Sequence, residues 1–164
     1  TSTQNIGFDF NFNGTNFSRL TVDSNGYVTF GGSASDQCCP NRIPYTDEID
    51  DNTLLTFWTD LDPSKGGNVY VQTLGAAPNR QFVVQWNVPH ISAAASLLFN
   101  VELVLNESDN SFEYRYGSVD GSAQTYLNNG YPAIIGTQID ENTVDLLSVL
   151  APNIQNGTGF RFTP

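Results

Sequence analysis

Apolar and polar residues alternate with a period of two along much of the chain, the pattern of strands with one buried face. Residues 6–12, 99–105 and 112–116 show the alternation most clearly. The predicted strands are residues 6–12, 17–22, 27–30, 54–59, 68–74, 80–88, 97–105, 111–116, 133–139, 143–149 and 160–162. We therefore expect an all-β fold, an antiparallel β-sandwich of about ten short strands with long loops.

Asn-Gly pairs indicate two tight turns, Asn13-Gly14 and Asn25-Gly26, each of the two-residue hairpin type. Longer connections separate other strands. Long loops in a compact β domain are more often functional than accidental. The three longest predicted loops are residues 31–53, 88–96 and 117–132.

One segment, residues 91–98, could be helical because of its alanine run, but Pro89 precedes it and a loop is equally consistent. The sequence shows no internal repeat, low-complexity tract or linker. We expect residues 1–164 to form a single extracellular β-sandwich module.

Charge and composition limit the kinds of molecule that the protein is expected to bind. The formal net charge is −11, from 17 acidic and 6 basic residues. The field of such a domain repels nucleic acids and anionic membranes and attracts cations such as calcium. No apolar run is long enough to cross a bilayer. Few lysines, no methionine and abundant Asn and Thr are typical of secreted proteins. We expect a secreted or cell-surface protein, with no nucleic-acid partner and no membrane insertion.

Cys38 and Cys39, the only cysteines of the chain, are adjacent in the polar loop of residues 31–53. Adjacent cysteines cannot tie distant segments together. They bond to each other in an eight-membered ring, remain free, or pair with another molecule, and the redox compartment decides among these. A self-bonded pair would make a stiff, apolar corner suited to ligand contact. The alternative is a loop stiffener without a ligand role.

Several segments resemble, in order, a nidogen-like (NIDO) extracellular domain. Residues 7–12 and 22–31 look like its opening, and residues 55–62 (LTFWTDLD) are similar to its Phe-Trp-x-Asp segment. Residues 80–86, 99–103, 112–116 and 133–136 complete the order, so the resemblance spans residues 6–136. Similar segments occur in secreted bacterial proteins, appended to hydrolases and adhesins. The resemblance implies a non-catalytic extracellular module and supplies no catalytic residue; the Cys38-Cys39 pair is not part of the pattern.

Two loops offer polar and aromatic side chains for carbohydrate. Sugar binding needs flat apolar faces together with planar polar groups for the hydroxyls. Tyrosine also caps ordinary turns, and the sequence does not show whether the two loops are close. The candidate ligand contacts are Cys38, Cys39, Asn41, Arg42, Tyr45, Tyr126, Asn128 and Tyr131.

Calcium is the one candidate cofactor, and none is predicted to be required. Asp60 and Asp62 begin a turn with oxygen side chains at alternate positions, and calcium takes about six to eight oxygens. The EF-hand pattern fails there, because Val71 stands where its last ligand, a glutamate, is needed; an Asx turn closing a hairpin is the alternative. Asp47 and Asp50 are a second candidate, against a solvated acidic loop.

Catalysis is poorly supported by the sequence. His90 is the only histidine, no nucleophile motif accompanies it, and we expect it to contact solvent or a ligand. Glycoside hydrolysis needs an acid and a base or nucleophile, but most acidic candidates lie in one loop. Trp58 and Trp86 are predicted to be core residues. We do not expect an enzyme.

The predicted function is a non-catalytic extracellular module that recognises carbohydrate, a glycan or an extracellular polymer, through the loop carrying the two cysteines. The alternative is a protein–protein adhesion or matrix module that uses a flat sheet face. A glycoside hydrolase is the least favoured hypothesis.

Overall fold

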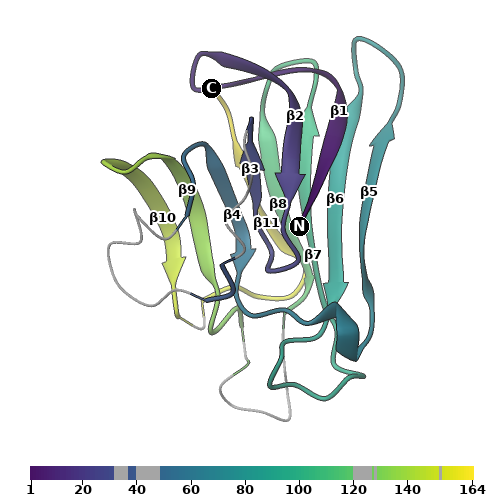
Figure 1. The fold of residues 1–164 in the computed structure, drawn as a ribbon, viewed down its shortest axis with the longest axis vertical. Helices are drawn as coiled ribbons and strands as arrows, with labels where there is room; N and C mark the ends of the chain where they lie inside the picture. Colours follow the sequence, from purple (N-terminus) through teal and green to yellow (C-terminus); the bar gives the residue numbers. More distant parts are fainter. Residues whose placement is uncertain (32–36, 40–48, 120–126, 128, 152) are drawn as a thin grey trace.

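Two antiparallel sheets pack face to face, as the alternation predicted (Figure 1). The structure, a computed structural model, describes residues 1–31, 37–39, 49–119, 127, 129–151 and 153–164. In the first sheet the order is β1 (Ser2–Phe12), β2 (Thr15–Val22), β3 (Val28–Phe30), β4 (Thr53–Trp58), β9 (Ile134–Asp140) and β10 (Thr143–Val149). In the second it is β11 (Thr158–Phe162), β8 (Phe112–Ser118), β7 (Phe99–Asn106), β6 (Gln81–Val88) and β5 (Asn68–Leu74). A short 3₁₀ helix, η1 (Pro63–Lys65), precedes β5.

The space between the sheets is filled by the apolar side of each alternating strand. Every second residue of β6 is buried there, Trp86 included, as are Tyr114 and Tyr116 of β8. Phe57 of β4 lies 6.2 Å from Tyr116, ring centroid to ring centroid, and so joins the two sheets. Burying an aromatic side chain of this size stabilises the fold by roughly 1.5–3 kcal/mol.

Buried hydroxyl and indole donors also link the sheets. Tyr114 Oη donates to the carbonyl oxygen of Gly136 at 2.7 Å, and Tyr116 Oη donates to that of Thr56 at 2.9 Å. Trp86 Nε1 donates to the carbonyl oxygen of Asp23 at 2.7 Å. Burial raises the pKa of both tyrosines, which keeps them protonated as donors. These bonds tie β8 and β6 to specific backbone positions of the opposite sheet.

Strand β4 is buried on both sides. Its register shifts between Leu55 and Trp58, so these two residues share the side that faces away from the sandwich core, while Leu54 and Phe57 face into it. A strand buried on both faces reads as a nearly continuous apolar run, and residues 54–58 fit this pattern with Thr56 as the one polar residue. The outer side of β4 therefore needs a cover of its own.

The first predicted turn is confirmed and the second is wrong in type. Phe12 pairs with Thr15, and Asn13 and Gly14 both have positive φ (48° and 79°), as a primed hairpin turn requires. At the second site Val22 pairs with Val28, so the loop has five residues, 23–27. Asn25 is buried inside that loop and bonds to other segments, which a two-residue turn would not permit.

Of the two alternatives left open for residues 91–98, the structure shows the loop: the segment forms turns between β6 and β7. One further expectation is corrected. The turn after Asp60 does not close a hairpin, because β4 and β5 belong to different sheets. The chain changes sheet there, through η1.

A charged clamp closes the opposite end of the sandwich. Arg80, just before β6, donates its backbone N–H and its Nε to Glu107 Oε2 at 2.9 and 2.8 Å. The second guanidinium edge pairs with the other Glu107 oxygen, and Nη1 donates to the carbonyl oxygen of Gly7 in β1. The guanidinium also lies 5.5 Å from the Phe8 ring centroid. One arginine thus joins both sheets, and the pairing lowers the pKa of Glu107 to about 2.

Gly26 is expected to be intolerant of a side chain. It has a φ of 82°, and a Cβ there would lie 2.2 Å from the carbonyl oxygen of Phe57, whose N–H donates to Gly26 O. Gly26→Ala should lower the free energy of unfolding by at least about 3 kcal/mol, measured by urea denaturation. Gly14→Ala is the matched control: its φ is similar (79°) but nothing lies within 4 Å, so the loss should be only about 1 kcal/mol. Equal losses would show that close packing at Gly26 does not matter.

Because of Glu107, the free energy of unfolding should fall at low pH. Its pKa falls from an ordinary 4.5 to about 2 in the folded state, so its stabilising effect is complete above pH 4.5 and is lost as the pH falls toward 2. Glu107→Gln should therefore be less stable than the parent at pH 7 and change less in stability between pH 4.5 and 2. Urea unfolding across this range measures both effects. Glu141→Gln, at an exposed turn, should keep the parental profile.

Candidate functional site

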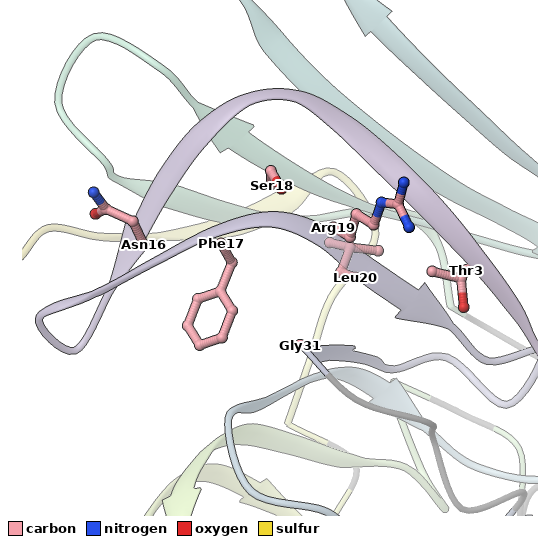
Figure 2. A pocket seen from close by; sticks show the side chains of 7 residues that line it. All are labelled: Thr3, Asn16, Phe17, Ser18, Arg19, Leu20 and Gly31. Atoms are coloured by element: carbon pink, nitrogen blue, oxygen red, sulfur yellow. The ribbon is translucent and has the colours of Figure 1, made fainter.

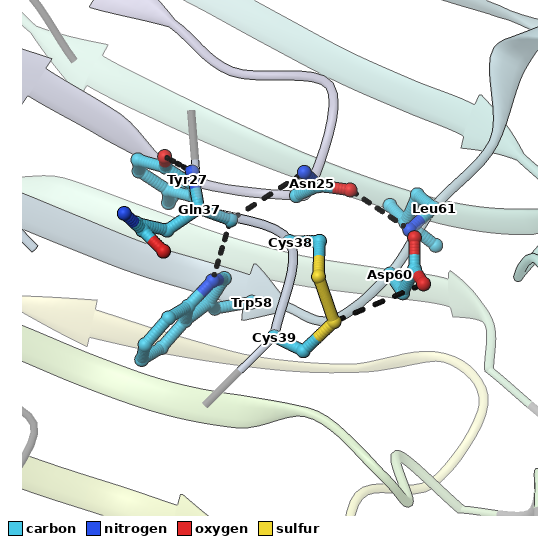
Figure 3. The surroundings of a disulfide bond; sticks show 8 residues. All are labelled: Asn25, Tyr27, Gln37, Cys38, Cys39, Trp58, Asp60 and Leu61. Atoms are coloured by element: carbon cyan, nitrogen blue, oxygen red, sulfur yellow. Dashed lines mark hydrogen bonds between the residues drawn. A yellow bond between two sulfur atoms is a disulfide. The ribbon is translucent and has the colours of Figure 1, made fainter. Parts of the chain in front are cut away.

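The backbone of Gln37 is anchored on the outer side of the first sheet. Its carbonyl oxygen accepts from Trp58 Nε1 at 3.1 Å and from Asn25 Nδ2 at 3.4 Å (Figure 3). Its N–H donates to Tyr27 Oη at 3.2 Å. Three side chains from two segments therefore hold the backbone of one residue on both sides of its Cα atom. A buried indole N–H without an acceptor costs free energy, so the bond from Trp58 stabilises the position of the Gln37 carbonyl.

A second hydrophobic cluster lies beneath this anchor, outside the sandwich core. It consists of Tyr27, Ile49, Leu55, Trp58 and Ile134, all at most 5% exposed. Tyr27 and Trp58 meet edge to face, with 6.2 Å between ring centroids. The prediction that Trp58 and Trp86 are core residues is confirmed, although the two belong to different clusters.

Cys38 and Cys39 are bonded to each other, directly after the anchored peptide (Figure 3). Cys38 is exposed and Cys39 is half-buried. Asp60 Oδ2 lies 3.8 Å from Cys39 Sγ. This is a packing contact, because a disulfide sulfur carries no hydrogen to donate. We call Cys38, Cys39 and Asp60 the disulfide corner; it sets an apolar ridge beside a carboxylate.

Two hydrogen bonds, one at Asp60 itself and one at the next residue, fix the position of Asp60. Its carbonyl oxygen accepts from Ile91 N–H at 2.8 Å, and the next residue, Leu61, donates to Asn25 Oδ1 at 3.1 Å. Asn25 thus bonds to the peptide before the disulfide and to the peptide after Asp60. One buried amide therefore sets the distance between the two halves of the corner.

His90 lies near the corner but faces inward. It is 7% exposed, and its Nδ1 accepts from the Ser92 N–H at 3.1 Å. Of the two contacts expected for it, the contact with solvent is wrong, and contact with a ligand stays a prediction. Burial lowers the pKa of His90, and nearby Asp60 opposes part of that shift. Lys65 Nζ donates to the carbonyl oxygens of Ile91 and Ala93, closing the same turn. The histidine serves the packing of the 88–96 connection.

The corner is also the one cluster of potential metal ligands found among residues that the structure describes. Disulfide sulfurs are not the thiolates that bind metals, so Asp60 alone would remain as a ligand. Asp62 instead accepts from Ser64 N–H and Ser64 Oγ at 2.9 and 2.6 Å, the predicted Asx turn. The carbonyl oxygen of Asp50 accepts from Thr53 Oγ1. Calcium binding stays a prediction.

Of the predicted ligand contacts, the structure brings together Cys38 and Cys39. Tyr131 is half-buried in the turn before β9 and makes no hydrogen bond to the corner. Outside the described residues lie Asn41, Arg42, Tyr45, Asp47, Tyr126 and Asn128. The role of Asp60 beside the disulfide was missed: the sequence marked it only as a calcium candidate, and no local signal pairs it with residues 21 positions earlier.

A different depression, of about 400 Å³, lies over β1 and β2 (Figure 2). Three of its polar side chains are paired within the sheet. Thr3 Oγ1 lies 3.2 Å from Thr21 Oγ1, Arg19 Nε donates to Asn5 Oδ1 at 3.0 Å, and Asn16 Oδ1 accepts from Asn11 Nδ2 at 2.6 Å. These bonds leave it less polar capacity for a ligand than the disulfide corner has.

The described residues form a two-sheet sandwich with an anchored surface loop, and comparison with known proteins shows which family has this chain as a member. Residues 1–163 match the family model described as NIDO related, so the chain belongs to that family. Membership indicates an extracellular, non-catalytic binding module. No curated protein and no solved structure matches the chain. Among the described residues there is no helix with the length and apolar character needed to span a membrane.

The Gln37 anchor should control access to the disulfide. Tyr27→Phe removes the hydroxyl that accepts from Gln37 N–H and leaves the ring. We expect faster reduction of Cys38–Cys39 by a water-soluble phosphine under native conditions, with about 1 kcal/mol lost in the free energy of unfolding. Tyr116→Phe, which loses a hydroxyl bond inside the sandwich, should lose similar stability without faster reduction. An unchanged reduction rate in Tyr27→Phe would show that the anchor does not protect the disulfide.

Proposed function

We propose that this extracellular module recognises carbohydrate at the disulfide corner. The observation that carries the proposal is the position of the Asp60 carboxylate against a self-bonded cysteine pair whose first residue, Cys38, is exposed. Sugars present C–H faces beside hydroxyl groups, so their recognition uses an apolar surface next to polar groups of defined direction. The disulfide ridge offers the first and Asp60 offers two acceptor oxygens.

Rigidity supports the proposal. The three side-chain bonds to Gln37 and the Asn25 bond to Leu61 order the corner before a ligand arrives. Binding to an ordered surface loses less conformational entropy than binding that must order a loop. Weak ligands such as sugars benefit most from this, because their contacts are individually small.

Secretion or display on the cell surface accompanies the proposed function. A disulfide between neighbouring cysteines persists in an oxidising compartment. The net charge of −11 disfavours nucleic acids and anionic lipid as partners and favours a neutral glycan or extracellular polymer. A calcium ion bound to Asp60 would also coordinate hydroxyl groups of the sugar. Binding measured with a chelator tests whether calcium takes part.

A protein-adhesion role is the alternative, and one observation favours it. Edge strand β5 carries no charged residue, and Tyr70 and Leu74 on it are 52% and 43% exposed. An uncharged edge with open backbone groups is a template for pairing with another chain. Glycoside hydrolysis is less favoured, because that chemistry uses two carboxylates and the contacts at the corner supply one, Asp60.

The test is a glycan array, with calcium and again with chelator. We expect binding that falls at least about tenfold in Cys38→Ser with Cys39→Ser and in Asp60→Asn, equal to about 1.4 kcal/mol or more. Asp62→Ala removes a carboxylate of the neighbouring turn and should bind normally. Thermal unfolding confirms that each variant folds. A blank array in both buffers, or normal binding by both corner variants, would favour the adhesion role.

A further inference from the structure

We propose that the outer face of the five-stranded sheet is a second binding surface, for an extended neutral polysaccharide chain. This surface, here the amide face, is defined by Asn68 and Tyr70 of β5, Gln85 and Asn87 of β6, Asn100 and Glu102 of β7, Arg115 and Gly117 of β8, and Gly159 of β11. The proposal goes beyond the disulfide corner and stands on its own geometry.

Strand register aligns these side chains in a row that crosses the sheet. Tyr70 pairs with Gln85, Gln85 with Glu102, Glu102 with Arg115, and Arg115 with Gly159. Neighbouring strands are about 4.8 Å apart, so the row is roughly 19 Å long. It runs from an exposed tyrosine on one edge strand to a glycine on the other. A linear ligand could follow the row without meeting a wall at the glycine end.

A second row beside it consists of three asparagine amides and a serine. Asn68 pairs with Asn87, Asn87 with Asn100, and Asn100 with Ser118. Each primary amide carries two donor hydrogens and an acceptor oxygen in one plane. Hydroxyls of a sugar chain also donate and accept, so a row of amides can satisfy either direction at successive units.

The charges of the amide face are neutralised within the sheet. Arg115 bonds to Glu113 at 2.8 Å and lies 3.9 Å from Glu102, while Arg161 bonds to Glu113 and Asp109 at 3.1 and 2.7 Å. Gln85 Nε2 donates to Glu102 Oε1 at 3.0 Å and is thereby oriented. Because the arginines are already paired, the face offers little to a polyanion, which the net charge of −11 also repels.

Glycines create a trough along this surface. A groove of about 380 Å³ is lined by Asn100, Glu102, Arg115 and Thr158, with Gly117, Gly157 and Gly159 leaving space between them. Its volume lies in the range of small-ligand sites. Tyr70, 52% exposed at the far end of the row, supplies the aromatic face on which a sugar ring can stack.

The composition favours a polysaccharide over a protein partner. Protein interfaces bury aromatic and apolar side chains at their centre and keep charges at the rim. Here the centre of the row is Gln85, Glu102 and Arg115, and the aromatic residue is at the edge. The disulfide corner rests on the outer side of the other sheet, so the two surfaces can be tested separately.

The experiment titrates ¹⁵N-labelled protein with neutral oligosaccharides prepared from glucan, mannan, xylan and galactan, and with an acidic polyuronate fragment. We expect one neutral series to shift the side-chain amide signals of Gln85, Asn87 and Asn100, with affinity rising with chain length. Tyr70→Ala and Gln85→Ala should each weaken binding at least about fivefold. Leu74→Ala, on the same strand and side as Tyr70, is the matched control and should bind normally.

Two outcomes would overturn the proposal, and one would separate it from the disulfide corner. Amide signals that no neutral oligosaccharide moves, or that move only with the polyuronate, exclude the assigned ligand class. Shifts that disappear in Cys38→Ser with Cys39→Ser, but persist in Tyr70→Ala, would place the sugar at the disulfide corner. Shifts that persist in the cysteine variant and weaken in Tyr70→Ala support the amide face even if the disulfide corner binds nothing.

Discussion

The apolar outer side of the first sheet is the constraint on which the candidate site depends. Trp58, Leu55 and Ile134 point away from the sandwich core, so a further layer must remove them from water. That layer must also accept a hydrogen bond from the Trp58 indole, because a buried donor without an acceptor is costly. The carbonyl oxygen of Gln37 meets this demand. The position of the disulfide thus follows from the burial of a tryptophan at the end of the next strand, β4, 21 residues after Gln37.

The disulfide is held rigid by hydrogen bonds from neighbouring segments of the chain. A bond between neighbouring residues closes no long loop, so it removes little entropy from the unfolded chain. Order at the corner comes instead from Tyr27, Asn25 and Trp58, which hold the preceding peptide. Asp60 is fixed from the other direction, through its backbone and through Leu61. The corner is therefore stiff because the sheet beneath it is stiff, and its exposed atoms are free to contact a ligand.

The sequence predicted the strands well, since period-two alternation is local information that burial on one face imposes directly. It failed where long-range contacts decide. Asn25-Gly26 looked like a tight turn, but Asn25 bonds to the peptides of Gln37 and Leu61, and those bonds need a wider loop. His90 was expected to contact solvent or a ligand, but its backbone pairs with that of Leu61 beyond β4 and its side chain is buried. The contact between Cys39 and Asp60 has no local sequence signal, because it depends on where the end of β4 lies relative to the loop that carries the cysteines.

The two outer faces of the sandwich differ, and strand composition explains why. Outward residues of the first sheet include Leu55 and Trp58, which require a cover. Outward residues of the second include Gln85, Asn100 and Glu102, which hydrogen-bond to one another and can remain in water. One face therefore carries a loop and the other stays open as far as the described residues extend. Binding at both would place two ligands on opposite sides of the module. Such a module would bridge two polymer strands rather than grip one, since a short chain cannot reach around the sandwich.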